Sequence, residues 1–287
     1  MNVEALKKEL ISRCNKLAAG KRVLAIEDTT QFNFTHHSGK LRPGELGGTY
    51  YGNEHILLLH PTLIYDLNQS IALGYGDVRI WTRDPDQPRS TKKRHKQLPI
   101  EQKESYRWIE SAHQTRENIS SAAQIIIVTD REGDIYELFD RVPDNRTDLL
   151  VRASYDRSLA DQDNYLFQYL DDLPVQGSYK LELRSTRDRS KHEAQIEVRF
   201  DKVKLLKPRQ RNMPGAPKTI ELFVVDAREH PSTVKEGENP VHWRLYTTCP
   251  VETLEDAREI IEWYCLRWQI EQLFRTLKTK GLNFEES

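Results

Sequence analysis

The chain of 287 residues carries 43 Lys and Arg against 44 Asp and Glu, and 37% of its residues are hydrophobic. This composition is typical of a globular protein with one large domain or two small ones, and it excludes a disordered chain and a strongly basic one. The widely spaced Cys14, Cys249 and Cys265 form no CxxC motif, and no apolar run reaches membrane-spanning length, so a cytoplasmic protein is predicted.

A leading helix and a group of strands are predicted before residue 100. Residues 3–18 have the periodicity of an amphipathic helix, with Leu6, Leu10, Ile11 and Leu17 on its apolar side. Extended segments joined by short Gly- or Asn-containing turns follow, and they are typical of an antiparallel meander. These segments cover residues 21–34, 47–52, 55–65 and 70–83. A basic run over 92–96, flanked by prolines, then predicts a loop.

Helices and strands alternate over residues 103–160. Residues 103–118 predict a helix, and the run QIIIVT at 124–129 predicts a strand buried on both faces, as in the middle of a mixed sheet. A short helix over 134–142 and a second buried strand over 148–152 follow. The pattern therefore predicts an α/β fold in which the meander and these strands belong together.

The pattern changes at about residue 161 and again at about residue 251. Four segments that alternate apolar and polar residues between 161 and 250 predict a β-rich region of antiparallel strands. The stretch from Trp263 to Lys278 predicts one helix with a buried stripe of Leu266, Ile270, Leu273 and Leu277. The other side of this helix carries Tyr264, Arg267, Glu271, Arg275 and Lys278. For a lone helix, a solvated face with salt bridges is the ordinary interpretation of such residues.

Acidic residues occupy three positions that suit a metal site. Asp28 and Asp130 each follow an apolar strand, and the edge of a sheet is where ligands gather. With Glu271 on a helix packed alongside, these carboxylates would supply the oxygen ligands that Mg²⁺ prefers. A single Asp at a strand end is more often a cap or turn residue, so the set of three carries the prediction.

Other polar residues near these acids fit less well as metal ligands. Glu27 precedes Asp28 and is expected to point to the opposite face of the strand. Glu132 and Asp134 are expected to support Asp130 or to begin a helix. His36 and His37 have no metal-ligand spacing and are interpreted as structural or DNA-contacting. No Gly-rich phosphate loop is present in the sequence, which disfavours a P-loop enzyme.

The spacing Tyr264-x2-Arg267-x3-Glu271-x6-Lys278 is similar to the Y-x2-R-x3-E-x6-K signature of bacterial DDE transposases of the insertion-sequence-four family. Asp28-Thr29-Thr30 and the segment 130–134 resemble the two Asp motifs of that family. The resemblance covers residues 23–278 and implies a ribonuclease-H-like mixed sheet with flanking helices, interrupted by an antiparallel β-rich insertion. The expected division is a leading helix at 1–20, the core at 21–160, the insertion at 161–250 and the closing helix at 251–287.

The same resemblance implies a role for each motif residue. Asp28, Asp130 and Glu271 would form the catalytic triad and hold two Mg²⁺ or Mn²⁺ ions. The DNA contacts would come from Tyr264, Arg267, Lys278, Arg152 and Trp243. Trp243 would stack on a base flipped out near the cleavage site, an interaction of about 1–3 kcal/mol, and ordinary core packing beside Val241 and Leu245 is the alternative.

The implied reaction is phosphoryl transfer on double-stranded DNA. Water would cut one strand at the transposon end, the freed 3′-hydroxyl would close a hairpin on the opposite strand, and the reopened end would attack target DNA. The implied setting is a homodimer on DNA, associated with the bacterial nucleoid in the cytoplasm and not with a membrane.

Two alternatives remain open from the sequence. Only 27 residues precede Asp28 and 16 follow Glu271, so the chain is interpreted as truncated at both ends relative to full-length members of this family. A catalytically incompetent remnant that binds DNA or a full-length partner is therefore the first alternative. The second is a ribonuclease-H-like nuclease with other nucleic-acid substrates, against which the Y-R-E-K spacing argues.

Overall fold

The computed structural model describes residues 2–35, 55–83, 97–185, 189–209 and 211–285. Three sequence predictions lie outside the described residues: the extended piece at 47–52, the basic run at 92–96, and the pair His36 and His37.

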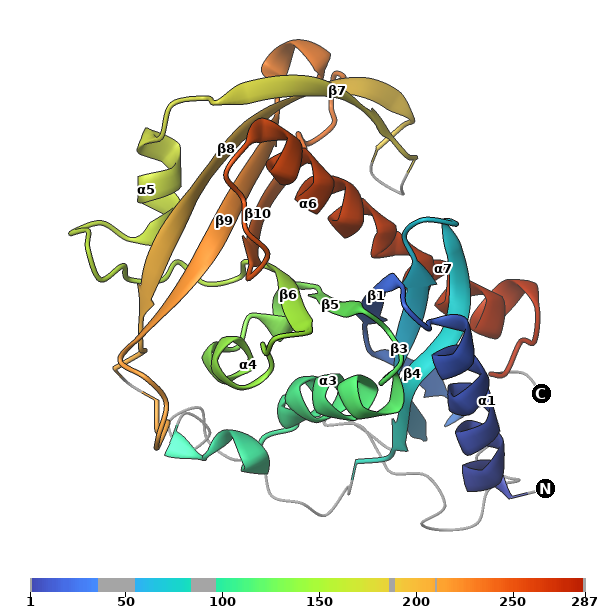
Figure 1. Cartoon of the computed structure of the whole chain (residues 1–287). Helices are drawn as coiled ribbons and strands as arrows, with labels where there is room; N and C mark the ends of the chain where they lie inside the picture. Colours follow the sequence, from blue (N-terminus) through green and yellow to red (C-terminus); the bar gives the residue numbers. More distant parts are fainter. Residues whose placement is uncertain (1, 36–54, 84–96, 186–188, 210, 286–287) are drawn as a thin grey trace.

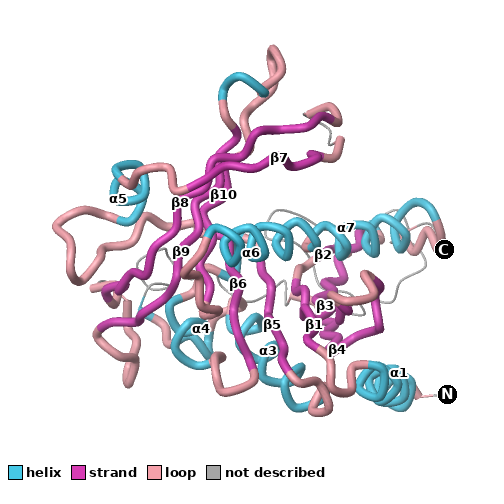
Figure 2. Tube along the Cα trace, turned by 45° about the horizontal axis from the view of Figure 1, so that its top comes forward, coloured by secondary structure: helices cyan, strands magenta, loops and turns pink. Residues whose placement is uncertain are grey.

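Ten strands of the described chain form one mixed sheet (Figures 1 and 2). Along the sheet the order is β2-β3-β1-β5-β6-β10-β9-β8-β7, and β4 pairs with β3. The strands are β1 (Arg22–Glu27), β2 (Thr30–Asn33), β3 (Ile56–Asp66), β4 (Ile71–Trp81), β5 (Gln124–Thr129), β6 (Thr147–Arg152), β7 (Gly177–Leu183), β8 (His192–Leu206), β9 (Thr219–Glu229) and β10 (His242–Thr247).

The first part of the sheet is the predicted meander with parallel strands added to it. β3 pairs antiparallel with β1, β2 and β4. β5 runs parallel to β1 on one side and to β6 on the other. The four consecutive apolar residues of β5 from Ile125 to Val128 are fully buried, because both faces of the sheet are covered at this point. The predicted mixed α/β sheet is therefore confirmed.

The β-rich region continues the same sheet. β10 pairs antiparallel with β6, with Leu245 opposite Arg152, and also with β9. Long antiparallel pairings then join β9 to β8 and β8 to β7. The alternation in the sequence predicted these four strands, but it did not predict helix α5 (Leu166–Asp172). In that short helix only Leu166 and Leu170 are buried, which is too few residues to give a clear period.

Helices cover the two faces of the sheet (Figure 2). On one face lie α1 (Val3–Leu17), α3 (Tyr106–Asn118) and α4 (Tyr136–Arg141), and the apolar core there includes Trp108 and Leu138. On the other face run α6 (Leu254–Leu266) and α7 (Trp268–Arg275), with a core that includes Ile260 and Trp263. Short 3-10 turns are η2 (Ile100–Gln102), η3 (Arg131–Gly133) and η4 (Pro231–Thr233), and η5 (Thr276–Lys280) is a π-helical turn. None of the helices in the described ranges is long and apolar enough to cross a membrane.

The prediction of one helix from Trp263 to Lys278 was wrong in its boundaries. The helix begins earlier, at Leu254, where Thr253 and Asp256 form a capping box that the sequence already contained. It is interrupted at Arg267, whose backbone N–H donates to the carbonyl of Tyr264 in a tighter turn. Tyr264 is buried at 4% exposure, and the guanidinium carbon of Arg267 lies 6.0 Å from the centre of its ring.

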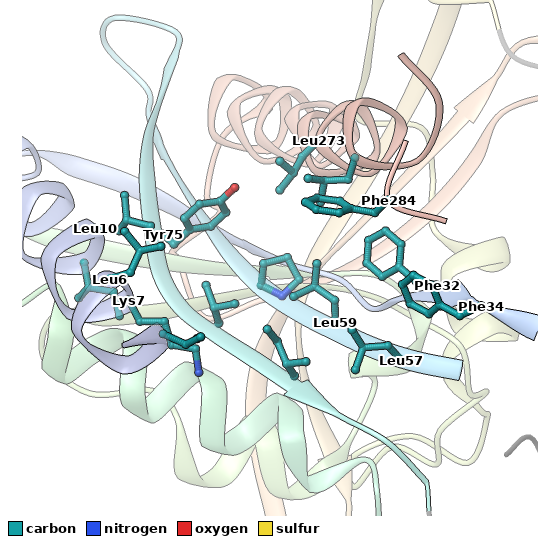
Figure 3. A pocket seen from close by; sticks show the side chains of 16 residues that line it. Leu6, Lys7, Leu10, Phe32, Phe34, Leu57, Leu59, Tyr75, Leu273 and Phe284 are labelled. Atoms are coloured by element: carbon teal, nitrogen blue, oxygen red, sulfur yellow. The ribbon is translucent and has the colours of Figure 1, made fainter. Parts of the chain in front are cut away.

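An apolar pocket of about 360 Å³ lies between α1, the strands β2 to β4 and the chain that follows α7 (Figure 3). Leu273 and Leu277 of the predicted stripe reach this pocket, whereas Ile270 is fully buried beneath α7. Much of the remaining lining comes from Leu6, Leu10, Phe32, Leu57 and Phe284. Of the predicted apolar side of the first helix, Leu6, Leu10 and Ile11 line this pocket, whereas Leu17 is 52% exposed.

Candidate active site

The parallel pairing of β1 and β5 brings two of the predicted acids together. In its register Ile26 lies opposite Val128, and Asp28 and Asp130 each follow two residues later on the same face. Both turns hold their carboxylates through the backbone. The N–H of Thr29 donates to Asp28 Oδ1 (2.7 Å), and the N–H of Glu132 donates to Asp130 Oδ1 (2.8 Å). The two strands therefore end in two fixed carboxylates at one edge.

Glu271 reaches the same edge from α7, and Arg267 connects it to Asp28. One nitrogen of the Arg267 guanidinium lies 3.3 Å from Asp28 Oδ2, and the other donates to Glu271 Oε1 in a short contact. The side chains of Asp28 and Arg267 are 19% and 18% exposed, so this bridge is largely shielded from water. The guanidinium therefore acts as an internal counter-ion for two of the three acids.

The pKa of Asp28 depends on its burial and on the charged groups around it. Burial, and then the neighbouring Asp130 carboxylate, raise the pKa of Asp28 to about 6. Arg267 opposes this shift, and Glu271 adds to it at longer range. The site therefore concentrates more negative charge than the single guanidinium neutralises, which is the condition that favours a bound cation.

The donor set fits a divalent metal ion in its chemistry. Three carboxylates supply only hard oxygen ligands, which suit Mg²⁺ and Mn²⁺. Within the described ranges, however, no three acidic, His or Cys side chains stand close enough to form a ready-made metal cluster. The Arg267 guanidinium bridges Asp28 and Glu271. A metal ion that takes oxygen atoms from both acids would have to compete with this guanidinium.

Aromatic and basic groups from β10, β6 and α6 lie next to the acids. The rings of Trp243 and Tyr264 meet edge to face, with centroids 5.9 Å apart. Burial raises the pKa of Tyr264, against the opposing effect of Arg267 and Arg152. The Tyr264 hydroxyl has no hydrogen-bond partner among the described residues. Trp243 is half-buried and packs against the α6 core, and its role in base stacking stays a prediction.

Lys278 lies apart from this group in the described structure. Its ammonium stands 5.6 Å from the centre of the Phe32 ring, on the side of the apolar pocket. Arg152 lies close enough to Tyr264 to oppose the rise in the pKa of its hydroxyl, and one guanidinium nitrogen of Arg152 donates to the carbonyl of His242 (3.3 Å). Of the five predicted DNA-contacting residues, Arg267, Tyr264 and Trp243 are linked by ring contacts, and Arg152 lies near enough to influence Tyr264.

A polar network beneath the acids was not predicted from the sequence. Glu27 points away from Asp28, as expected, and is fully buried beside Thr62 and His60. His60 contacts Thr29, and Thr29 also accepts from Arg107 of α3. These residues carry no motif spacing, and only the pairing of β1 with β3 and the packing of α3 bring them together. Nothing in the sequence pattern could have identified them.

Two other acidic or basic features have structural partners. Asp134 is a buried anchor, because its carboxylate accepts from Arg157 and from the backbone N–H groups of Ser154 and Tyr155. In the basic segment 202–211, Lys202 and Lys204 both form ion pairs with Glu221. The positive charge of these two lysines is therefore partly neutralised by Glu221.

Comparison with protein families gives one match over most of the chain. The family model described as "Transposase DDE domain" matches residues 102–287. The matched region contains Asp130, Glu271 and the α6–α7 helices, whereas Asp28 precedes it.

Proposed function

The chain belongs to the transposase DDE domain family, and on this premise we propose that it cuts DNA at transposon ends and joins the freed 3′ ends to target DNA. The observation that supports this most is the convergence of Asp28, Asp130 and Glu271 from β1, β5 and α7. Three elements far apart in the sequence deliver carboxylates to one sheet edge, together with a guanidinium that can bind phosphate.

In this proposal the three acids hold two divalent cations, Mg²⁺ or Mn²⁺. Such ions, when bound, stabilise the charge that develops on the attacking and leaving oxygens of a phosphodiester. The protein supplies their positions. Asp28 and Asp130 are fixed by their own turns, and Glu271 is carried by a helix packed on the sheet.

The basic and aromatic residues would hold the DNA. Arg267 can exchange its contacts with Asp28 and Glu271 for a DNA phosphate, and Arg152, Tyr264 and Lys278 would provide further phosphate contacts. Half-buried Trp243 would stack on a base displaced from the duplex, at a gain of about 1–3 kcal/mol. A hairpin on the transposon end, a homodimer on paired ends, membership of the insertion-sequence-four family, and location at the bacterial nucleoid belong to the same proposal.

The test uses a supercoiled plasmid that carries the ends of the chain's own genomic element, with Mn²⁺ or Mg²⁺ added. We expect the wild-type chain to release 3′-hydroxyl ends. Asp28→Asn, Asp130→Asn and Glu271→Gln should retain DNA binding in a gel-shift assay and lose cleavage. A matched control is Glu255→Gln, an exposed acid in the first turn of α6, which should cleave normally.

Two results would overturn the proposal. One is a Glu271→Gln protein that still nicks the transposon end in Mg²⁺. The other is a wild-type chain that cleaves RNA–DNA hybrids and leaves transposon ends intact, which would identify a nuclease of another kind.

A further inference from the structure

One arginine connects the two strand ends that carry the aspartates. Arg107 lies on α3, on the face of the sheet opposite α7. Its Nε donates to Thr29 Oγ1 (3.0 Å), and Thr29 immediately follows Asp28. Its terminal nitrogen donates to Glu132 Oε2 (2.6 Å), in the turn that begins with Asp130. A single guanidinium thus contacts both acid-bearing turns.

The Arg107 side chain is itself held firmly in place. It is 13% exposed, and a third nitrogen contact goes to the carbonyl of Glu104 (3.1 Å). The guanidinium carbon lies 5.3 Å from the ring centre of Trp108 and 5.9 Å from that of Trp81. Cation–π contacts and three hydrogen bonds leave a planar, five-donor group little freedom to move. The distance between its two acceptors is therefore set by the covalent geometry of the guanidinium.

Thr29 Oγ1 joins Arg107 to His60. Arginine can only donate, so Thr29 Oγ1 accepts from Arg107, and the same oxygen lies 2.9 Å from His60 Nδ1. On the other side of the imidazole ring, His60 Nε2 faces Glu27 Oε2 at 3.9 Å. Both of those atoms are buried and have no other hydrogen-bond partner in the described part of the chain. Arg107 thereby fixes the orientation of Thr29, whose backbone N–H holds Asp28.

We propose that Arg107 is a positioning residue, whose two-point contact with Thr29 and Glu132 sets the spacing of Asp28 and Asp130 for a divalent cation; this inference rests on the proposed function. Two neighbouring carboxylates repel each other, so their turns tend to separate unless something ties them together. Arg107 touches neither carboxylate and acts through the residues beside them. Arg107 contributes by holding the two turns at a fixed distance, which a positive charge without the shape of the guanidinium would not do.

This reasoning separates arginine from lysine at position 107. Lysine keeps the positive charge, but a single ammonium cannot span Thr29 and Glu132 as the guanidinium fork does. Supporting residues around metal ligands change metal affinity by about 10–100-fold when they are mutated. Arg107→Lys and Arg107→Gln should therefore weaken metal binding to a similar extent.

The experiment measures Mn²⁺ binding to the full chain by electron paramagnetic resonance, without DNA, next to the melting temperature of each variant. Arg107→Lys and Arg107→Gln should bind Mn²⁺ at least about 10-fold more weakly than wild type. The matched control is Arg116→Lys, on the same helix, where the guanidinium pairs with Asp144 (3.1 Å) away from the acids. This control should bind Mn²⁺ as wild type does.

Two milder variants keep the test valid if the Arg107 variants do not fold. Thr29→Val and Glu132→Ala each remove one end of the bridge, and each should weaken Mn²⁺ binding several-fold with the melting temperature nearly unchanged. The role of Arg107 would be overturned if Arg107→Lys, or both Thr29→Val and Glu132→Ala, bound Mn²⁺ with the affinity of the wild type. If Asp28→Asn also binds Mn²⁺ as wild type does, the metal site and the proposed function fail as well.

Discussion

At the scale of single residues, Arg267 has the most consequential position in the site. Its guanidinium bridges Asp28 and Glu271, and in the proposed function the same residue contacts a DNA phosphate. A DNA phosphate would compete with the two carboxylates for the N–H groups of this guanidinium. Binding of DNA by Arg267 would therefore release carboxylate oxygens that a cation can use, so DNA and metal are expected to favour each other's binding.

The counter-ion role of Arg267 predicts a shift in the titration of Asp28. A nearby cation lowers the pKa of an acid, so Arg267→Gln should raise the pKa of Asp28 further above about 6. Carboxyl-carbon NMR across pH 4–8 would measure this in the metal-free protein. Arg275→Gln, an exposed arginine at the end of the same helix, should leave the Asp28 titration where it is. An unchanged pKa in Arg267→Gln would contradict the counter-ion role.

His60 predicts a specific dependence of stability on pH. Burial, with smaller effects of Arg107 and Arg79, lowers the pKa of His60 to about 3, from about 6.5 in an unfolded chain. The stability tied to neutral His60 is fully present above pH 6.5 and is lost as the pH falls toward 3, because only the unfolded chain takes up the proton. Between pH 7 and pH 5 the loss should be about 2 kcal/mol.

Urea unfolding at several pH values checks this expectation. His60→Asn should be less stable than wild type at pH 7, and the difference should shrink by about 2 kcal/mol at pH 5. If the stabilities of the two proteins fall in parallel over this range, His60 is not held neutral by the fold.

The acids could be predicted as single residues because each has a local signal, a strand end or a helical spacing. Arg107, Thr29 and His60 could not, because their relation exists only after β1, β3 and α3 have packed together. The burial of Tyr264 was missed for a related reason. Helical spacing places Tyr264 beside Arg267, as the structure does, but spacing alone does not show that the core beneath α6 covers the Tyr264 ring.

At the scale of elements, the turn from β5 to α4 contains three acids with three different tasks. Asp130 faces the site, Glu132 receives Arg107, and Asp134 is buried. Gly133 allows the turn to close, because a Cβ there would stand 2.1 Å from Thr129 Oγ1. Sequence reasoning grouped Glu132 and Asp134 as supporting residues, and only the contacts distinguish them.

The different burial of these acids predicts different costs of removal. Asp134→Ala leaves Arg157 buried without its carboxylate, and such a loss costs about 3–5 kcal/mol of unfolding free energy. Glu132 is 63% exposed, so Glu132→Ala should cost less than about 1 kcal/mol. Urea unfolding of the two variants measures both values. Equal costs would show that the Asp134–Arg157 pair does not anchor the turn.

Elements with strong period or composition were predicted well from the sequence. The apolar run of β5, the alternating strands β7 to β10, and the helices α1 and α3 all lie where they were expected. The sequence-based predictions were wrong where local backbone geometry determines the ends or the existence of a helix. The break at Arg267 and the short helix α5 depend on contacts that a sequence window does not contain.

At the scale of the whole molecule, the β-rich region and the core share one sheet through the β6–β10 pairing. Strand β10 carries both Trp243 and Leu245, and Leu245 lies opposite Arg152 of β6. Trp243 lies opposite Ala227 of β9, so the β-rich region also helps to position the candidate DNA contacts. A change in the β8–β9 region can therefore reach the site through continuous strand pairing.

This continuity predicts that the two regions unfold together. Native-state hydrogen exchange should show central amides of β5, β6 and β10 opening with the same free energy, while the edge strand β7 opens more easily. Thermal unfolding of the described strands should then give a single main transition. Two separate transitions, with β8 to β10 melting before β5, would mean that residues 161–250 behave as an independent domain.

Asp28 and its partners on the α6–α7 helices lie far apart in the sequence, so they are synthesised at different times. Arg267 and Asp28 are separated by 239 residues, so a ribosome working at about 5–20 residues per second needs roughly 10–50 s to make the second after the first. In the later part of that interval, after Asp130 has been added, the nascent chain carries both aspartates without Glu271 or Arg267. In the proposed function the acid set is complete only when α7 has docked, so DNA cleavage would begin only after Glu271 has been synthesised and packed against the sheet.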